Sequence, residues 1–95
     1  MRFMIKASGK QGLTKADFAE MMAVIPAQEA QDKKLRQQGI QEGAAHVAVD
    51  RSAAWKILNC DSQDKAHELL QAMPTYRFCD FDITPLLNEE DNLPK

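Results

Sequence analysis

The sequence has few of the features that point directly to a function. Its 95 residues include only two cysteines, two histidines, one tryptophan and one tyrosine. No apolar run approaches the roughly 20 residues of a membrane-spanning helix. The opening residues, MRFMIKAS, are too short and too polar a stretch for a signal peptide. We therefore expect a cytoplasmic protein with no membrane partner.

Neither sign of charge dominates the chain. Lys and Arg number 12, Asp and Glu number 14, and the formal charge is -2 at pH 7. Because no face or tail is visibly basic, a nucleic-acid partner has no electrostatic support. The remaining composition, 44% hydrophobic and 27% charged, is typical of a soluble globular protein of one domain.

The cysteines and histidines do not indicate a metal site. Cys60 and Cys79 have no metal-like spacing, and His46 and His67 are not part of a metal-binding motif. Cys79 falls on the apolar face of a predicted strand, so we expect reduced, buried thiols rather than a disulfide. Neither a serine–histidine–acid set nor a phosphate-binding glycine loop can be drawn from the sequence. We expect no metal and no cofactor.

Alternating and helical patterns divide the chain into six elements. Residues 2–8, 40–49, 53–59 and 78–83 alternate with period two and predict strands. A helix begins at Thr14 and carries an apolar stripe to Ile25. Pro26 either kinks this helix or starts a second segment, and the helical region ends near Gly39. A second helix follows Ser62. The order β-α-β-β-α-β predicts an α+β, ferredoxin-like fold, with a four-stranded antiparallel sheet and both helices on one face.

The other face of this sheet predicts a partner. It would carry Met4, Phe78 and either Trp55 or Leu58, which is too apolar a patch for water. We therefore expect a homodimer formed sheet against sheet. The folded domain should span residues 1–87, and residues 88–95 should form an acidic, flexible tail.

The C-terminal half resembles a known family. From Ser62 to Leu86, a helix with Leu-Leu, then Met-Pro, an aromatic stretch and Asp-Phe-Asp-Ile-Thr-Pro-Leu are similar to the muconolactone isomerase-like proteins. The opening RFMIK matches their first strand, which puts Lys6 on the family lysine, and Glu29 lies close to a family acidic residue. One departure is the segment Gln41–His46, which stands where the family has a tryptophan-rich strand.

The resemblance implies an assembly and a chemistry. Such proteins form dimeric α/β barrels, often in larger rings such as decamers, and act without a cofactor. Their namesake reaction moves a ring double bond of an unsaturated lactone in aromatic catabolism. Relatives act as cyclases, dehydratases or decarboxylases in biosynthesis. The changed strand at Gln41–His46 implies a differently shaped and more polar pocket here.

Three polar residues are candidates for catalysis. Glu29 continues the apolar stripe of the first helix and could take a proton next to a carbonyl, unless the helix rotates after Pro26 and leaves it in solvent. Lys6 could stabilise a negative oxygen, or be an ordinary lysine at the rim of the sheet. His46, between small neighbours, is the next candidate base, although a lone histidine is more often structural. Asp32, one turn after Glu29, we expect at the surface.

Four further residues are candidates for substrate binding: Trp55, Tyr76, Arg77 and Phe78. Tyr76 and Arg77 precede the last strand and could cover a pocket mouth, or be exposed loop residues. We interpret the chain as a cofactor-independent isomerase or cyclase for a small oxygenated, lactone- or polyketide-like substrate. The alternative is a non-catalytic ligand-binding or accessory subunit. An oxygenase of the related dimeric-barrel type ranks below both.

Overall fold

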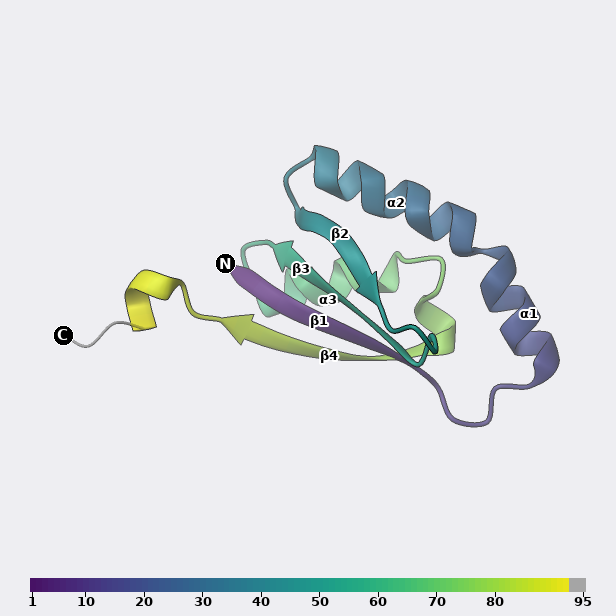
Figure 1. The fold of residues 1–95 in the computed structure, drawn as a ribbon. Helices are drawn as coiled ribbons and strands as arrows, with labels where there is room; N and C mark the ends of the chain where they lie inside the picture. The colour runs from purple at the N-terminus through teal and green to yellow at the C-terminus, as the bar shows by residue number, and fades with distance from the viewer. Residues whose placement is uncertain (93–95) are drawn as a thin grey trace.

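The computed structural model describes residues 1–92 and has the predicted order of strands and helices (Figure 1). The elements are β1 (Arg2–Gly9), α1 (Lys15–Ala23), α2 (Ile25–Gln37), β2 (Gln41–Val47), β3 (Ala53–Asn59), α3 (Gln63–Gln71) and β4 (Cys79–Leu86). A short 3-10 turn, η1 (Tyr76–Phe78), precedes β4, and a second one, η2 (Glu89–Asn92), follows it.

The four strands form one antiparallel sheet in the order β2-β3-β1-β4. Phe3 of β1 is opposite Leu58 of β3, and Ile5 is opposite Ile83 of β4. Residues that are directly opposite share a face of the sheet, so these side chains all point to the helix layer. The ferredoxin-like fold is confirmed.

The core lies between the sheet and α3. Five of its side chains are at most 1% exposed: Phe3, Ile5, Leu58, Ala66 and Leu70. Burial of a side chain the size of leucine or phenylalanine stabilises a fold by about 1.5–3 kcal/mol. This small cluster therefore fixes α3 against the two central strands, as the alternating patterns predicted.

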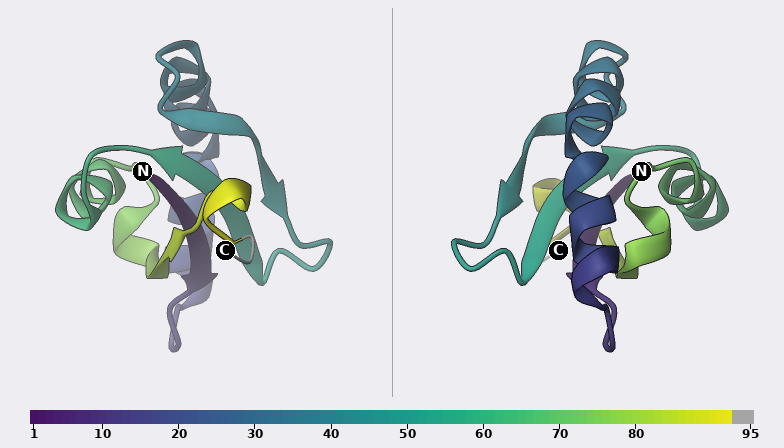
Figure 2. Two further views of the ribbon diagram at one scale, coloured as in Figure 1. Left: turned by 90° about the vertical axis from the view of Figure 1, so that its left-hand side faces the viewer. Right: turned by 90° about the vertical axis from the view of Figure 1, so that its right-hand side faces the viewer.

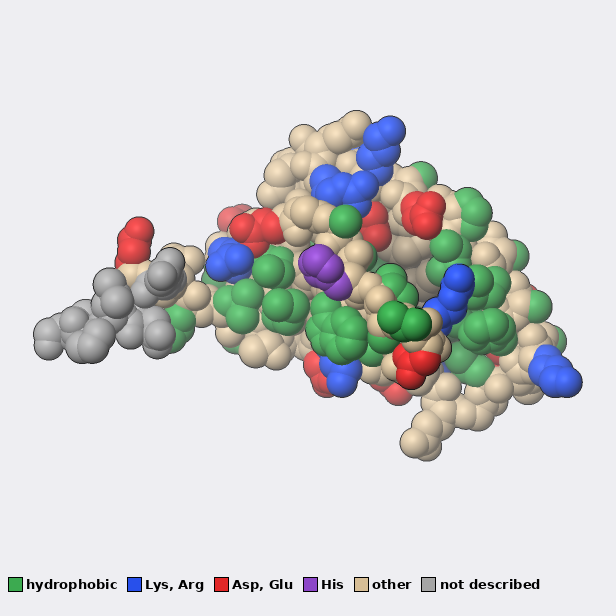
Figure 3. All heavy atoms as spheres, viewed as in Figure 1, with side chains coloured by type: hydrophobic (Ala, Val, Ile, Leu, Met, Phe, Trp, Pro, Cys, Tyr) green, Lys and Arg blue, Asp and Glu red, His purple; other side chains and the backbone are tan. Residues whose placement is uncertain are grey.

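The opposite face of the sheet carries Lys6 and Trp55, which are paired across β1 and β3. Met4 and Ile57 are paired next to them and are half-buried. In the view of Figure 3, hydrophobic side chains gather over the sheet, whose strands lie in front of α3 in the same view of Figure 1. Of the two alternatives, Trp55 and not Leu58 thus belongs to this open face, together with Met4 and Ile57.

The prediction for Phe78 is wrong. It was expected to alternate with Cys79 on the open face, but the strand begins only at Cys79 and Phe78 belongs to the turn η1. Its side chain is 2% exposed and belongs to the buried core. The turn, which follows Pro74 and Thr75, rotates this residue inward before the alternation begins.

Pro26 starts a new helix. α1 ends at Ala23, and Pro26 occupies the first turn of α2. Backbone N–H groups of a first turn have no acceptor within the helix, so the missing N–H of proline costs no hydrogen bond there. Thr14 and Asp17 form a capping box at the start of α1, as the sequence predicted in outline. α1 has no buried residue, whereas α2 buries Gln28, Asp32 and Leu35. Figure 2 shows α2 and α3 standing well apart from each other.

The chain continues beyond the sheet in an extended direction. The molecule measures 53 × 26 × 25 Å, and Figure 1 shows β4 and η2 leading away from the body. The predicted tail of residues 88–95 includes η2, while residues 93–95 lie outside the described part of the chain. Within the described residues, no helix combines the length and hydropathy that crossing a bilayer requires.

Candidate functional site

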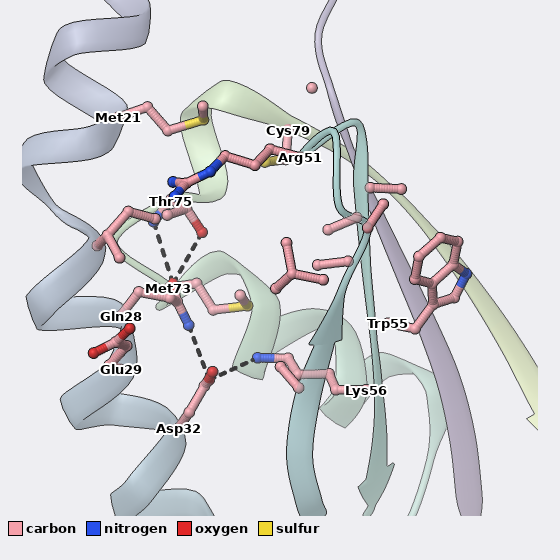
Figure 4. A pocket seen from close by; sticks show the side chains of 18 of the residues that line it. Met21, Gln28, Glu29, Asp32, Arg51, Trp55, Lys56, Met73, Thr75 and Cys79 are labelled. Atoms are coloured by element: carbon pink, nitrogen blue, oxygen red, sulfur yellow. Dashed lines mark hydrogen bonds and ion pairs between the residues drawn. The ribbon is translucent and has the colours of Figure 1, made fainter.

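A cleft of about 700 Å³ separates α1 and α2 from β2 and β3. It forms because α1 has no side chain in the core and because the facing strands carry small residues, which leave space. Part of its wall consists of alanine and methionine side chains: Ala44, Ala45, Ala48, Ala54, Met21, Met22 and Met73. Figure 4 shows this cleft with α2 on one side and the β2–β3 hairpin on the other. A volume of this size suits a small organic molecule.

A buried ion pair lies on the wall of the cleft. Lys56 belongs to the strand face that carries Leu58 and Ile5, so its side chain points to the helices. Its Nζ donates to Oδ1 of Asp32 on α2 at 3.0 Å. The two side chains are 7% and 11% exposed. This pair connects α2 to β3, a central strand of the sheet, at the wall of the cleft.

Gln28 and Thr75 hold the carboxylate of Asp32 in place. The Thr75 hydroxyl donates to Oε1 of Gln28 at 2.9 Å, and Gln28 Nε2 donates to Asp32 Oδ1 at 3.0 Å. The Thr75 backbone N–H also points to Gln28 Oε1, at 3.4 Å. Since an N–H can only donate, this contact fixes which end of the Gln28 amide faces Asp32.

The described hydrogen bonds leave part of the pair free. Both bonds to Asp32 end on Oδ1, and within residues 1–92 no side chain or amide donates to Oδ2. Lys56 uses one of its three N–H groups on Asp32. A molecule in the cleft could therefore meet a carboxylate oxygen and an ammonium group side by side. In a poorly hydrated site, both groups interact with a substrate more strongly than they would in water.

Cys79 adds a protonated thiol to the cleft wall. Its burial, and next the negative charge of Asp80, raise the pKa of the Cys79 thiol, while Lys10 acts weakly in the other direction. Burial also raises the pKa of Cys60, outside the cleft. Both cysteines are free. Since the thiolate is the nucleophile, neither cysteine has the environment of an activated one.

The predicted catalytic residues lie on two sides of the sheet. Glu29 lines the cleft and is exposed (Figure 4). Lys6 and His46 both pair with Trp55, so all three side chains belong to the open face. There, His46 and Trp55 line a small hollow of about 130 Å³, and Lys6 Nζ is 6.0 Å from the Trp55 ring centre. Within one chain, Glu29 therefore does not meet Lys6 or His46.

Of the four predicted substrate-binding residues, Trp55 is among those that line the cleft, whereas Tyr76, Arg77 and Phe78, which precede β4, are not. Tyr76 stacks on Phe81 with ring centres 5.6 Å apart, and Phe78 is in the core. Arg77 forms an exposed ion pair with Glu20 at 2.7 Å and lies 4.0 Å over the Phe78 ring. These contacts fasten η1 to α1 and to the core.

The sequence prediction for Asp32 is wrong, and Lys56 was not among the candidates. Asp32 was expected at the surface but is 8% exposed, because α2 starts afresh at Ile25 and its buried stripe is Gln28, Asp32 and Leu35. A signal for Lys56 was available, since a lysine between Ala54 and Leu58 on a core-facing strand requires a buried partner.

A metal site has no support from the side chains. In residues 1–92, no three histidine, cysteine, aspartate or glutamate side chains are close enough together to hold an ion. The polar groups of the cleft instead form one hydrogen-bonded row, from Thr75 through Gln28 and Asp32 to Lys56. In such a row the Asp32 carboxylate can take up a proton, and the Lys56 ammonium can stabilise a charge on oxygen.

The fold is shared with two solved enzymes. The structure of muconolactone isomerase aligns with a TM-score of 0.76 at 16% identity, over 100% of this chain and 97% of that chain. The 5-chloro-2-hydroxyhydroquinone dehydrochlorinase TftG from Burkholderia phenoliruptrix AC1100, in complex with 2,5-dihydroxybenzoquinone, aligns with a TM-score of 0.69 at 16% identity, over 97% and 99%. Identities this low show the fold alone.

Comparison with curated proteins gives no match. The family described as muconolactone delta-isomerase, in contrast, matches residues 1–91, which is nearly the whole chain. Together with the strand order β2-β3-β1-β4, this match agrees with the motifs between Ser62 and Leu86. The chain therefore belongs to the muconolactone delta-isomerase family.

Proposed function

We propose that this protein is a cofactor-independent isomerase or cyclase that moves a proton next to a carbonyl group of a small oxygenated molecule. The observation that carries the proposal is the buried Asp32–Lys56 pair on the wall of a cleft of about 700 Å³. Membership of the muconolactone delta-isomerase family supports a double-bond shift in a lactone as the reaction type.

In this proposal Asp32 is the base. Its Oδ2, which no described group occupies, takes a proton from the carbon next to the substrate carbonyl. The electron pair of the broken C–H bond moves to the carbonyl oxygen and forms an enolate. An N–H of Lys56 donates to that oxygen as its negative charge develops. Asp32 then returns the proton at the far end of the conjugated system, so the double bond moves and no atom is lost.

Gln28 and Thr75 are positioning residues in this scheme. They hold Oδ1 of Asp32 through a buried hydrogen-bonded row, which leaves Oδ2 without a donor among the described residues. A base held within hydrogen-bond reach of the C–H group gains rate from its fixed orientation. The low exposure of Lys56 and Asp32, 7% and 11%, strengthens the interaction of Lys56 with the enolate.

Glu29 is the rival base, because it also lines the cleft. Lys6 and His46 remain candidates only for a site on the open face, where a second copy of the chain could complete the surroundings of Trp55. A mechanism that combines Glu29 with Lys6 in one chain is not favoured by their positions on opposite sides of the sheet. The Asp32 proposal is therefore tested against Glu29 directly.

The test follows proton exchange in muconolactone by NMR in D₂O. Asp32→Asn keeps the shape and the bonds from Gln28 and Lys56 but accepts no proton, so exchange and turnover should fall by roughly 10²–10⁴-fold. Glu29→Gln is the matched control and should change the rate by less than about tenfold. Full activity of Asp32→Asn, with Glu29→Gln inactive, would reject Asp32 as the base.

A ligand-binding or accessory protein is the second candidate function. It is favoured by the separation of Glu29 from Lys6 and His46, which leaves the originally expected catalytic set incomplete. Titration of the protein with 2,5-dihydroxybenzoquinone and with muconolactone distinguishes the two functions. Binding in the cleft without any deuterium entering muconolactone would favour the non-catalytic role.

A further inference from the structure

The turn between β2 and β3 contains a strained residue. Arg51 has φ of 62°, and it is the one non-glycine residue with positive φ in the described chain. The turn is held by Ser52 N–H donating to Asp50 Oδ1 at 3.0 Å and by Arg51 N–H donating to Ala48 at 2.8 Å. Glycine or asparagine would adopt this conformation more easily. The backbone therefore gives no reason for arginine at this position.

The Arg51 side chain crosses the mouth of the cleft. Figure 4 shows it running from the hairpin toward Met21 and Thr75, and its Nη1 is 3.7 Å from the Met22 sulfur. A thioether is a weak acceptor and does not neutralise a guanidinium. In the described residues, the ion pairs of arginine are Arg2–Glu42 and Arg77–Glu20, and Arg51 has none.

Arg36 is the natural comparison for Arg51. It also lines the cleft, and it too has no carboxylate partner in the described chain. Arg36, however, lies in the last turn of α2, where a positive charge stabilises the helix carbonyl groups. Arg51 has no such structural role. Its strained backbone, its position over the cleft and its unused donors all remain without explanation from the fold.

We propose that Arg51 is a specificity-determining residue that binds a carboxylate of the substrate at the mouth of the cleft. A guanidinium presents paired N–H groups that match the two oxygens of a carboxylate. The substrate body would then lie along the alanine and methionine walls, with its reacting carbon at Asp32 and Lys56. The inference rests on the proposed function in taking this cleft as the substrate site.

The test compares two probes of nearly equal shape, phenylacetate and phenylacetamide. Both are titrated into the whole protein, and binding is followed by NMR of backbone amides and of the arginine Nε–Hε groups. The carboxylate should bind roughly tenfold more tightly than the amide, because a charged hydrogen bond to arginine is gained. The Arg51 Nε–Hε signal should shift during the phenylacetate titration.

Variants then assign the preference to one residue. Arg51→Met should remove the preference for phenylacetate, and Arg51→Lys should restore only part of it, since lysine lacks the paired donors. Arg36→Met, the matched control, should keep it. The proposal is overturned if wild-type protein binds both probes equally or neither, if the preference survives Arg51→Met, or if Arg36→Met or Lys56→Met removes it instead.

This experiment is separable from the test of the proposed function. Asp32→Asn should lose proton exchange yet keep the preference for phenylacetate, because the carboxylate would bind at the other end of the cleft. If Arg51→Met loses the preference for phenylacetate while the wild-type protein shows no proton exchange in muconolactone, the anion site is supported and the isomerase is rejected. If the wild-type protein catalyses proton exchange but binds phenylacetate and phenylacetamide equally, the isomerase is supported and the anion site is rejected.

Discussion

Breaking the buried ion pair should be far more damaging than removing it whole. Lys56→Met leaves the Asp32 carboxylate almost without water and with one remaining hydrogen bond, from Gln28. Loss of one partner of a buried pair typically costs about 3–5 kcal/mol. The Gln28 bond and the open Oδ2 favour the lower end, so we expect about 3 kcal/mol. For a protein of roughly 5–15 kcal/mol total stability, the melting temperature should fall by about 12–24 °C.

The double variant tests whether this cost belongs to the pair. Asp32→Asn keeps an acceptor for Lys56 and should cost about 2 kcal/mol. The double variant Asp32→Asn with Lys56→Met leaves no buried charge and should cost about 1–2 kcal/mol. The coupling energy is then about 3–4 kcal/mol, well above the roughly 0.5 kcal/mol expected of independent sites.

Urea unfolding, followed by far-UV circular dichroism at one fixed protein concentration, measures all four proteins of the cycle. The control cycle uses Arg77 and Glu20, which are closer, at 2.7 Å, but 63% and 57% exposed. That exposed pair should couple by less than about 1 kcal/mol. If Asp32 and Lys56 couple no more strongly than this control, the pair is not desolvated, and the proposed low-dielectric site fails with it.

Two further predictions concern assembly and pH. Wild-type protein should be a homodimer or larger ring joined at the open face, and Trp55→Glu should shift it toward single chains in light scattering; a wild-type mass of one chain at micromolar concentration contradicts this. Hydrogen bonds from the Thr14 backbone N–H and side chain lower the pKa of Asp17, and those from Ser52 lower the pKa of Asp50. A carboxyl group whose pKa is lowered by folding stabilises the folded state at pH values above its unfolded pKa of about 3.9. This stabilisation is lost as the pH falls through the folded-state pKa. Protection of the amides of α1 and of Ser52, expressed relative to the intrinsic exchange rate at each pH, should therefore fall below about pH 4, and Asp17→Asn should remove that dependence in α1.

The faces of the strands could be predicted from the sequence because their period is fixed at two. Once Phe3 and Ile5 are assigned to the core, Met4 and Lys6 must point to the other side, and pairing carries this assignment to Trp55 and Leu58. The turn at Phe78 escaped the same rule, since the alternation could not reveal where the strand begins. The fold class therefore followed from local patterns, while one end of a strand did not.

The helix at Pro26 was less predictable because two phases of the stripe were open. Continuing the stripe of Phe18, Met22 and Ile25 leads to Glu29. A new helix from Ile25 instead buries Gln28, Asp32 and Leu35, and leaves Glu29 exposed at the cleft. A helix break of one residue changes the buried face by about 100°, and the sequence around Val24 does not specify that angle. The candidate base thus moved from Glu29 to Asp32.

Lys56 shows how the site could nevertheless have been found before the fold was known. Alternation places it with Ala54 and Leu58 on the core-facing side of a central strand, where an unpaired ammonium is not stable. The helix layer must then supply a carboxylate. If the phase of the first helical region is taken from its last apolar residue, Leu35, the positions three and seven residues earlier are Asp32 and Gln28. A charged residue that violates an otherwise regular core pattern is thus evidence for a partner, and here that partner is the residue we propose as the base.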